Sequence, residues 1–349
     1  MAKFRVALSS DFRKADGSPA YPMFDLTPLT SDPRVEVGYV AAVDGAMPAD
    51  ALGDYDALIL LVSKFNRTAI HANRRLGLVA RFGVGYDSVD VSACTASDIA
   101  LCITPDGVRR PVAVSILTLM LALTGKLMVK DRLTRQGPDG FNKRAQHMGA
   151  GLMGKVLGSI GIGNIGAELF RLARPLDMRF MAHDPFADKP LAAGLGIELV
   201  ALDDLFRHAD ILSVNCPLTP ETRHIVNAER LALMKPAAYL INTSRGPTVD
   251  QQALTRALRD RRIAGAGLDV FEEEPPAIDE PILALDNVIV TPHALCWTDQ
   301  CFAGIGVADV KAVLDFMNGR EPPAIVNRAV TNSEGWKSRL ETNRKTFAN

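Results

Sequence analysis

Short apolar runs rich in β-branched residues alternate with helix-length segments along almost the whole of this 349-residue chain. Such alternation is typical of parallel sheets whose two faces are covered by helices. Runs without polar residues, such as Ala57–Val62, suit central strands that are buried on both faces. The predicted strands form two series: Phe4–Leu8, Val35–Val40, Ala57–Val62, Leu78–Phe82 and Ala100–Thr104, then Val156–Ile162, Arg179–His183, Ile211–Cys216, Ala238–Thr243, Ala266–Val270 and Val288–Thr291.

Two long helical patterns separate and follow these series. Pro111–Lys130 lies between them, and its proline suits a first helical turn, where the missing N–H costs nothing. Asp299–Met317 follows the last strand. We interpret both as crossover helices that join one discontinuous domain to one inserted domain. The predicted domains are 1–106 with 298–330, and 107–297, followed by a polar tail at 331–349.

Charge and composition exclude several classes of protein. Lys and Arg number 39 and Asp and Glu 40, so the formal net charge is −1 and no basic surface for nucleic acid is indicated. No apolar run reaches the roughly 18 residues that a membrane helix needs. The five cysteines include no Cys-x-x-Cys pair, which indicates thiols in a reducing compartment rather than disulfides or a metal site. We therefore expect a cytoplasmic protein without nucleic-acid, membrane or metal partners.

A glycine-rich turn follows the strand predicted at Val156–Ile162. It reads Gly-x-Gly-x-x-Gly and opens a helix, the arrangement that binds the pyrophosphate of a dinucleotide. The first glycine permits the tight turn, the second lets the backbone approach the phosphates, and the third lets helix and strand pack closely. The helix N-terminus offers backbone amides to the anion. The predicted phosphate-binding residues are Gly161, Gly163, Asn164, Ile165 and Gly166.

An acidic residue, Asp184, ends the next predicted strand. Its carboxylate is suited to accept hydrogen bonds from an adenosine ribose, and it would repel a 2′-phosphate. This favours NAD over NADP as the cofactor. The alternative is that Asp184 only opens the turn at Asp184-Pro185.

Three further strands are followed by residues suited to catalysis. Arg245 comes after Ala238–Thr243, and its planar guanidinium matches a carboxylate. Glu274 ends a run of three glutamates, and His293 follows the last strand. A carboxylate beside a histidine orients its ring for proton transfer near neutral pH. The structural alternatives are a surface salt bridge for the arginine, a solvated turn for the glutamates and an ordinary surface or core position for the histidine.

Together these segments resemble the D-isomer-specific 2-hydroxyacid dehydrogenases, over roughly residues 3–330. The motifs that carry the resemblance are the glycine-rich turn with Asp184, Asn242–Gly246, Asp269–Phe271 with Glu274-Pro275, Thr291–His293, Arg81–Asp90, Cys216–Thr219 and Gly319–Pro322. The resemblance implies two doubly wound parallel-sheet domains, a Rossmann NAD-binding domain inserted into a discontinuous flavodoxin-like substrate domain. It also implies hydride transfer between NAD(H) and a small D-2-hydroxy acid or 2-keto acid.

The same resemblance implies roles for individual residues. Arg245 would hold the substrate carboxylate, and His293, paired with Glu274, would act as acid and base. Further cofactor contacts would come from Cys216, Pro217, Thr222, Thr243, Ser244 and Asp269, and substrate contacts from Val84, Gly85 and Lys64. A homodimer is expected, formed through the nucleotide domain and the segment Gly125–Gly154.

Some features leave the function open. Val114 stands where family members often carry glutamate, and Arg109 and Arg110 either face a second acidic group of the substrate or form surface charge. A phosphite or other oxyanion dehydrogenase on the same scaffold is one alternative, and a non-catalytic NADH-sensing scaffold is another. The sequence does not determine which 2-hydroxy acid is used or in which direction.

Overall fold

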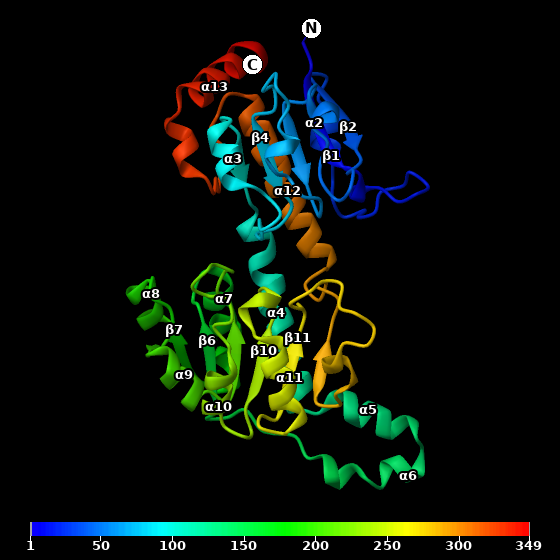
Figure 1. Cartoon of the computed structure of the whole chain (residues 1–349), viewed down its shortest axis with the longest axis vertical. Helices are drawn as coiled ribbons and strands as arrows, with labels where there is room; N and C mark the ends of the chain where they lie inside the picture. Colours follow the sequence, from blue (N-terminus) through cyan, green and yellow to red (C-terminus); the bar gives the residue numbers. More distant parts are fainter. Residues whose placement is uncertain (1, 349) are drawn as a thin grey trace. The chain divides into compact units, whose positions relative to one another are not determined.

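The computed structural model describes residues 2–348, which divide into two compact units. The first comprises the chain up to Val108 and from Trp297 onward, and the second is Arg109–Cys296. Each unit contains one parallel sheet with helices on both faces, so the predicted α/β fold is confirmed (Figure 1). The sequence places the boundaries after residues 106 and 297. The assignment of substrate and cofactor to the two units stays a prediction.

The sheet of the first unit has the strand order β2-β1-β3-β4-β5. This is the flavodoxin-like order. Strand β2 is added on one side of β1 and strands β3 to β5 on the other, so the order switches between β1 and β3, although the strands are parallel. In the register, Phe4 of β1 pairs with Val35 of β2, and Val6 of β1 pairs with Ala57 of β3. The strands are β1 (Phe4–Ser9), β2 (Val35–Val40), β3 (Ala57–Leu60), β4 (Leu78–Arg81) and β5 (Ala100–Cys102).

Two groups of helices cover this sheet. The short helices α2 (Ala49–Leu52) and α3 (Val91–Ala96) contribute to one apolar core. On the other face, Phe4 packs edge-on against Phe316 of α12 (Asp299–Met317) and Phe347 of α13 (Glu334–Phe347). A further short helix, α1 (Thr27–Thr30), precedes β2.

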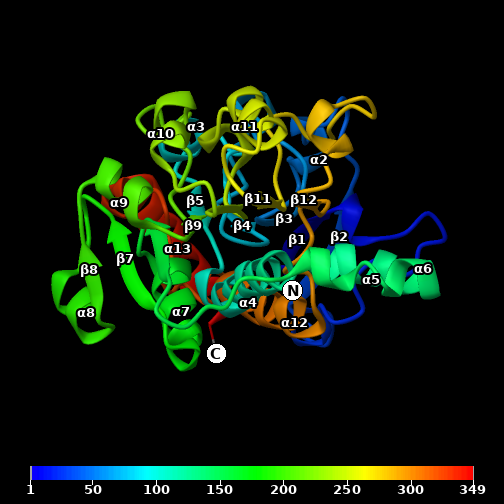
Figure 2. The ribbon, with the colours of Figure 1, turned by 90° about the horizontal axis from the view of Figure 1, so that it is seen from below.

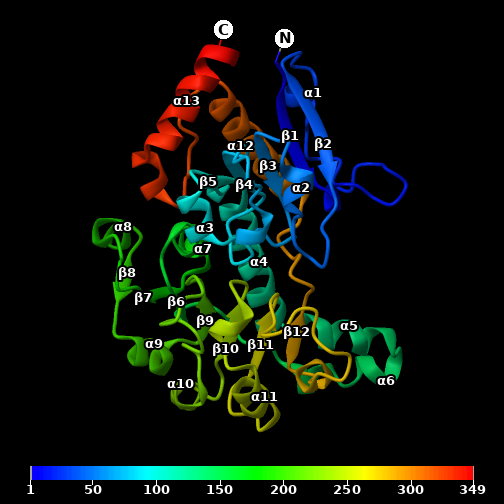
Figure 3. The same ribbon diagram turned by 45° about the horizontal axis from the view of Figure 1, so that its top comes forward.

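The predicted polar tail at 331–349 is wrong, because most of this segment is the helix α13. Ser333 caps it by accepting a hydrogen bond from the backbone N–H of Trp336. Trp336 is 1% exposed and stacks on Phe316 with ring centroids 5.2 Å apart, so α13 lies along α12 (Figure 3). The sequence does not predict this helix, because too few of its residues are apolar and buried to give a helical periodicity.

The sheet of the second unit has the order β12-β11-β10-β9-β6-β7-β8. Counted from β6, this is the Rossmann order with one added strand, β12. The strands are β6 (Val156–Ile160), β7 (Arg179–His183), β8 (Ile197–Leu199), β9 (Ile211–Val214), β10 (Tyr239–Asn242), β11 (Gly265–Leu268) and β12 (Val288–Val290). The sequence missed β8, an edge strand of three residues with a central glutamate.

Helices pack on both faces of this second sheet (Figure 2). One core is shared with α4 (Pro105–Thr124) and α7 (Asn164–Ala173), and the opposite core with α9 (Leu202–His208), α10 (Ala228–Leu233) and α11 (Gln251–Arg259). The short helix α8 (Lys189–Gly194) precedes β8.

The first crossover helix differs from its predicted bounds, Pro111–Lys130. Helix α4 starts at Pro105, includes Pro111 in its interior, and ends before Lys126, which has a left-handed backbone. The chain then forms α5 (Leu127–Arg135) and α6 (Pro138–Phe141), which lie apart from the sheet on the side of β12 (Figures 1 and 3). By length and composition α4 is apolar enough to cross a membrane, but half of it is buried and Ile116 and Met120 are fully enclosed in the core.

A buried acid in α12 makes stability depend on pH. Asp309 is 0% exposed, and its carboxyl oxygens have no hydrogen-bond partner among residues 2–348. Burial raises the pKa of Asp309 well above the usual value, against the opposing charge of Arg81. The folded state therefore holds this proton more tightly than the unfolded chain, and stability falls as pH rises from the ordinary carboxyl pKa through the raised one.

We expect Asp309→Asn to be more stable than the wild type at pH 8 by about 1–3 kcal/mol, because the wild type must take up a proton or bury a charge on folding and each pKa unit is worth about 1.4 kcal/mol. The advantage should shrink towards pH 4, where the folded acid is neutral and the unfolded chain begins to take up the same proton. Urea unfolding across this range measures it, with the exposed Asp44→Asn as control. An advantage that does not vary with pH would contradict the prediction.

Candidate active site

The glycine-rich turn lies at the end of β6, where the strand order of the second sheet reverses between β6 and β9. Gly161 has φ +94°, and a Cβ there would lie 3.0 Å from the carbonyl oxygen of Asn215. A Cβ at Gly166 would overlap the carbonyl oxygen of Gly161. At Gly163, by contrast, a Cβ would meet no described atom within 4 Å, so the backbone at the start of α7 is open to a ligand. The turn therefore has the shape that a dinucleotide pyrophosphate requires.

Asp184 lies beside this turn, and its carboxylate is already engaged. Its Oδ2 accepts the backbone N–H of Ile162 at 2.9 Å, and its Oδ1 accepts that of Phe186 at 2.8 Å. Each oxygen has a second acceptor site for a ribose hydroxyl. Asp184, Gly163 and Asn164 line one hollow of about 240 Å³. Both interpretations of Asp184 are therefore compatible: its carboxylate shapes the turn, and it borders the hollow at the start of α7.

The turn that carries Arg245 is shaped by Asn242 at the end of β10. Asn242 is 1% exposed, and its Nδ2 donates to the carbonyl oxygen of Arg245 at 2.9 Å. Its Oδ1 accepts both the backbone N–H and the hydroxyl of Ser244. The Nη1 of Arg245 donates to the carbonyl oxygen of Ser244 at 2.6 Å. The sequence motif includes Asn242, but the sequence does not predict that its side chain shapes the Arg245 turn.

Glu274 and His293 form the pair that the sequence predicts. The Nδ1 of His293 lies 2.8 Å from Oε2 of Glu274, and the backbone N–H of Phe271 donates to Oε1 at 3.0 Å. Burial opposes ionisation of Glu274, but these two hydrogen bonds and the charges of His293 and Arg245 outweigh it and lower the pKa of Glu274. Glu274 is therefore a carboxylate at neutral pH. It contacts Nδ1 of His293, so Nε2, the other ring nitrogen, can exchange a proton with another group. The turn of Arg245 lies against the same segment, because a Cβ at Gly246 would overlap the carbonyl oxygen of Phe271, and the charge of Arg245 acts on the Glu274 carboxylate.

Asp269 follows β11 and holds the turn of His293. It is 3% exposed, and its Oδ1 accepts the hydroxyl of Thr291 at 2.6 Å and the backbone N–H groups of Ala294 and Leu295 at 3.1 and 3.2 Å. The backbone of His293 has φ +54°, a left-handed conformation that residues other than glycine rarely adopt. The expected cofactor contact of Asp269 stays a prediction, whereas its carboxylate clearly fixes this strained turn.

The other predicted cofactor residues differ in their surroundings. Cys216 belongs to the apolar core, and burial raises the pKa of its thiol to about 11. The hydroxyl of Thr222 closes its own loop by donating to the carbonyl oxygen of Pro217 at 2.6 Å. Thr243 keeps a buried hydroxyl without a hydrogen-bond partner among the described residues. An orphaned hydroxyl beside Arg245 fits a bound nicotinamide, so these surroundings support the predicted dinucleotide.

The predicted substrate residues belong to the first unit, at the carboxyl ends of β3 and β4. Gly83, directly before Val84 and Gly85, donates its N–H to the hydroxyl of Thr104 at 3.0 Å and accepts the N–H of Thr104 at 2.9 Å. Lys64 pairs through its backbone with the chain around Gly45. Their contact with a substrate stays a prediction. Arg110 is paired with Glu168 at 3.0 Å, while Arg109 lines the same hollow as Asp184.

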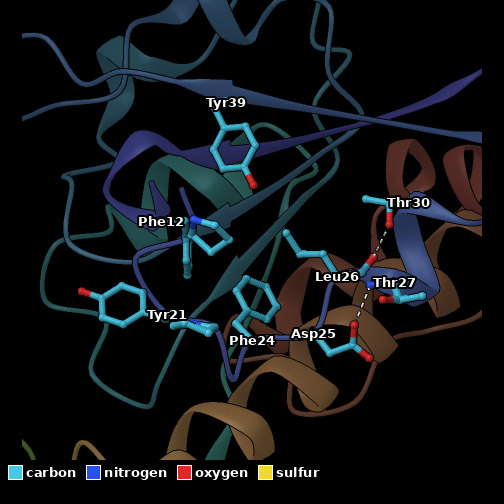
Figure 4. Close-up of a pocket in the computed structure, with 10 residues that line it drawn as sticks. Phe12, Tyr21, Phe24, Asp25, Leu26, Thr27, Thr30 and Tyr39 are labelled. Atoms are coloured by element: carbon cyan, nitrogen blue, oxygen red, sulfur yellow. Dashed lines mark hydrogen bonds between the residues drawn. The ribbon is translucent and has the colours of Figure 1, made fainter. Parts of the chain in front are cut away.

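The first unit has a second hollow of about 350 Å³. Phe12, Tyr21 and Phe24, from the proline-rich segment before α1, converge there with Tyr39 of β2 (Figure 4). Phe12 and Phe24 also pack on Phe82, next to Gly83. An aromatic wall therefore extends to the loop of Val84 and Gly85. No group of three His, Cys, Asp or Glu side chains in residues 2–348 is arranged to hold a metal ion.

Comparisons with known proteins identify the family. The NAD binding domain of the D-isomer specific 2-hydroxyacid dehydrogenases matches residues 117–294. The chain is 37% identical over 286 residues to a glyoxylate reductase of Thermococcus onnurineus, covering 80% of this chain and 85% of that protein. It is 36% identical to a D-3-phosphoglycerate dehydrogenase of Methanocaldococcus jannaschii, covering 84% of this chain and 56% of that protein. A D-lactate dehydrogenase from Aquifex aeolicus, solved with NAD and lactic acid, shares the fold with a TM-score of 0.76 and 29% identity, covering 90% and 96% of the two chains.

We expect Asp269→Ala to lower the free energy of unfolding by about 1–3 kcal/mol, because it leaves buried donors of the His293 turn unsatisfied. Amide hydrogen exchange at Ala294 and Leu295 should become faster. Asp286→Ala, which removes an exposed ion pair with Arg261, is the control and should cost less than about 1 kcal/mol. Equal losses in the two variants would show that Asp269 does not hold the turn.

Proposed function

This chain belongs to the D-isomer-specific 2-hydroxyacid dehydrogenases, a family of NAD-dependent enzymes, and we propose that it reduces a small 2-keto acid to the D-2-hydroxy acid. One observation carries the proposal: the Glu274 carboxylate holds His293, and the charge of Arg245 acts on the same carboxylate. These three residues follow the adjacent strands β11, β12 and β10 of the sheet whose strand β6 leads into the glycine-rich turn. A reduced carbonyl needs both a proton and a cation where negative charge develops.

Each residue has a distinct role in this proposal. When bound, the cofactor supplies or takes up the hydride. Arg245 binds the substrate carboxylate through its planar fork and polarises the neighbouring carbonyl. His293 donates a proton from Nε2 to the carbonyl oxygen during reduction and takes it back during oxidation. Glu274 fixes the ring orientation through Nδ1 and balances its positive charge.

The cofactor is held by the chain's own backbone and by Asp184 in this proposal. Amides at the start of α7 bind the phosphates, and Asp184 accepts the adenosine ribose hydroxyls. Thr243 and Ser244 lie next to Arg245 and approach the nicotinamide. Val84, Gly85 and Lys64 are the further residues that contact the substrate in this proposal. The glyoxylate reductase relatives make glyoxylate the first substrate to test.

We expect His293→Ala to lower kcat for 2-keto acid reduction by about 10²–10⁴, the usual contribution of a positioned proton donor. The affinity for NADH should remain within about twofold, because the proton is needed only in the chemical step. Absorbance of NADH at 340 nm gives the rate on a panel of keto acids, and NADH fluorescence gives the affinity. Near-normal turnover by His293→Ala would rule out this residue as the proton donor.

The same assay addresses the alternatives. Reduction of NAD with phosphite, without turnover on any keto acid, would favour an oxyanion dehydrogenase. NADH binding that changes the oligomeric state without any turnover would favour a sensing role. A preference for NADPH would contradict the role given to Asp184.

The segment Gly125–Gly154 is proposed as the homodimer interface. It includes α5 and α6, and it exposes Met128, Phe141 and Met148 at 50%, 55% and 74%. Apolar side chains gathered on an exposed arm are typical of an interface. We expect light scattering to give a dimer mass for the wild type and a monomer mass for the double variant Met128→Glu, Met148→Glu. Ile278→Glu, at an exposed position outside the arm, should stay dimeric; a dimeric double variant would exclude this interface.

A further inference from the structure

Two turns carry the proposed catalytic groups, and they lie directly against each other. The turn of Arg245 continues into Gly246, where a Cβ would overlap the carbonyl oxygen of Phe271. Phe271 in turn holds Glu274 through its backbone N–H. The separation between Arg245 and Glu274 therefore depends on how firmly these two backbones are held together.

His224 contacts both turns. Its backbone N–H donates to the carbonyl oxygen of Pro247 at 2.9 Å, just after Arg245. Its Nε2 lies 2.5 Å from Oε1 of Glu272, just after Phe271. The side chains of His224 and Glu272 are 37% and 28% exposed, so the contact is partly shielded from water. One residue thus ties the arginine turn to the glutamate turn.

Glu272 has a second anchor, Gln251 at the start of α11. The backbone N–H of Glu272 donates to Oε1 of Gln251 at 3.0 Å, and Oε2 of Glu272 accepts the backbone N–H of Gln251 at 3.3 Å. Arg223 places a further positive charge 3.9 Å from the same carboxylate. Glu272 is therefore restrained at both its backbone and its side chain, and this restraint passes to the adjacent N–H of Phe271.

We infer that His224 and Glu272 form a brace that positions Arg245 relative to the Glu274–His293 pair. The inference rests on the proposed function, since it concerns the geometry of that reaction. Both are positioning residues, because they act through the two turns and Gln251, which they contact. A surface ion pair that only added stability would contribute little and would leave turnover unchanged. A brace affects the rate, because small displacements of catalytic groups are costly in the transition state.

We expect His224→Ala and Glu272→Ala each to lower kcat about tenfold, with NADH affinity within about twofold of the wild type. The double variant should be no slower than the slower single variant, because both remove the same contact. His224→Gln keeps an N–H donor that reaches Glu272, and should retain kcat within about threefold of the wild type. Rates are expressed per NADH-binding site and measured well below each variant's Tm, so that loss of folded protein does not count.

His71→Ala is the matched control, since His71 lies 3.9 Å from Asp50 in the first unit, whereas both turns belong to the second. Its kcat should equal that of the wild type. A kcat per NADH-binding site unchanged in His224→Ala, with the wild type active and His293→Ala inactive, would overturn the brace and leave the proposed function standing. A wild type without turnover on any keto acid would overturn both. The brace would also be overturned if the losses of kcat in the two single variants multiplied in the double variant, because two residues that share one contact cannot each lose it independently.

Discussion

The common direction of the strands in the second sheet is the constraint on which the site depends. Strands β6, β9, β10, β11 and β12 are parallel, so the segments that follow them emerge at one edge of the sheet. The glycine-rich turn, the Arg245 turn, Asp269 and the His293 turn come from segments distant in sequence. They become neighbours because each immediately follows a strand of this set.

Local hydrogen bonds then convert proximity into geometry. Asn242 shapes the Arg245 turn, Asp269 holds the strained backbone at His293, and the N–H of Phe271 fixes one oxygen of Glu274. Each of these groups is buried or half-buried, where an unsatisfied donor or acceptor is costly. The residues that support the site are therefore also residues on which local folding depends.

The parts of the fold that could be predicted are those with a repeated or short-range signal. The buried parallel strand β3 is a continuous apolar run, and the spacing of Gly161, Gly163 and Gly166 is a short motif that is visible in the sequence itself. The edge strand β8 and the helix α13 have few buried residues, so their patterns are weak. Helix α4 continues through Pro111, although proline lacks the N–H of one helical hydrogen bond. The fixed φ of proline is itself helical, and the apolar packing of α4 outweighs the lost bond.

The chain's residue types and their order decided the α/β class, the dinucleotide turn and the identity of Arg245, Glu274 and His293 as candidates. These follow from periodicity and from the chemistry of single side chains at strand ends. Tertiary structure alone decided that Asp269 holds the His293 turn, that His224 meets Glu272, and that the carboxyl oxygens of Asp309 are buried without a hydrogen bond from any residue in 2–348. The first two of these pairings join residues 26 and 48 positions apart, and the burial of Asp309 depends on what surrounds its side chain. No local pattern records them, because burial and contact are set by how the sheet brings its loops together.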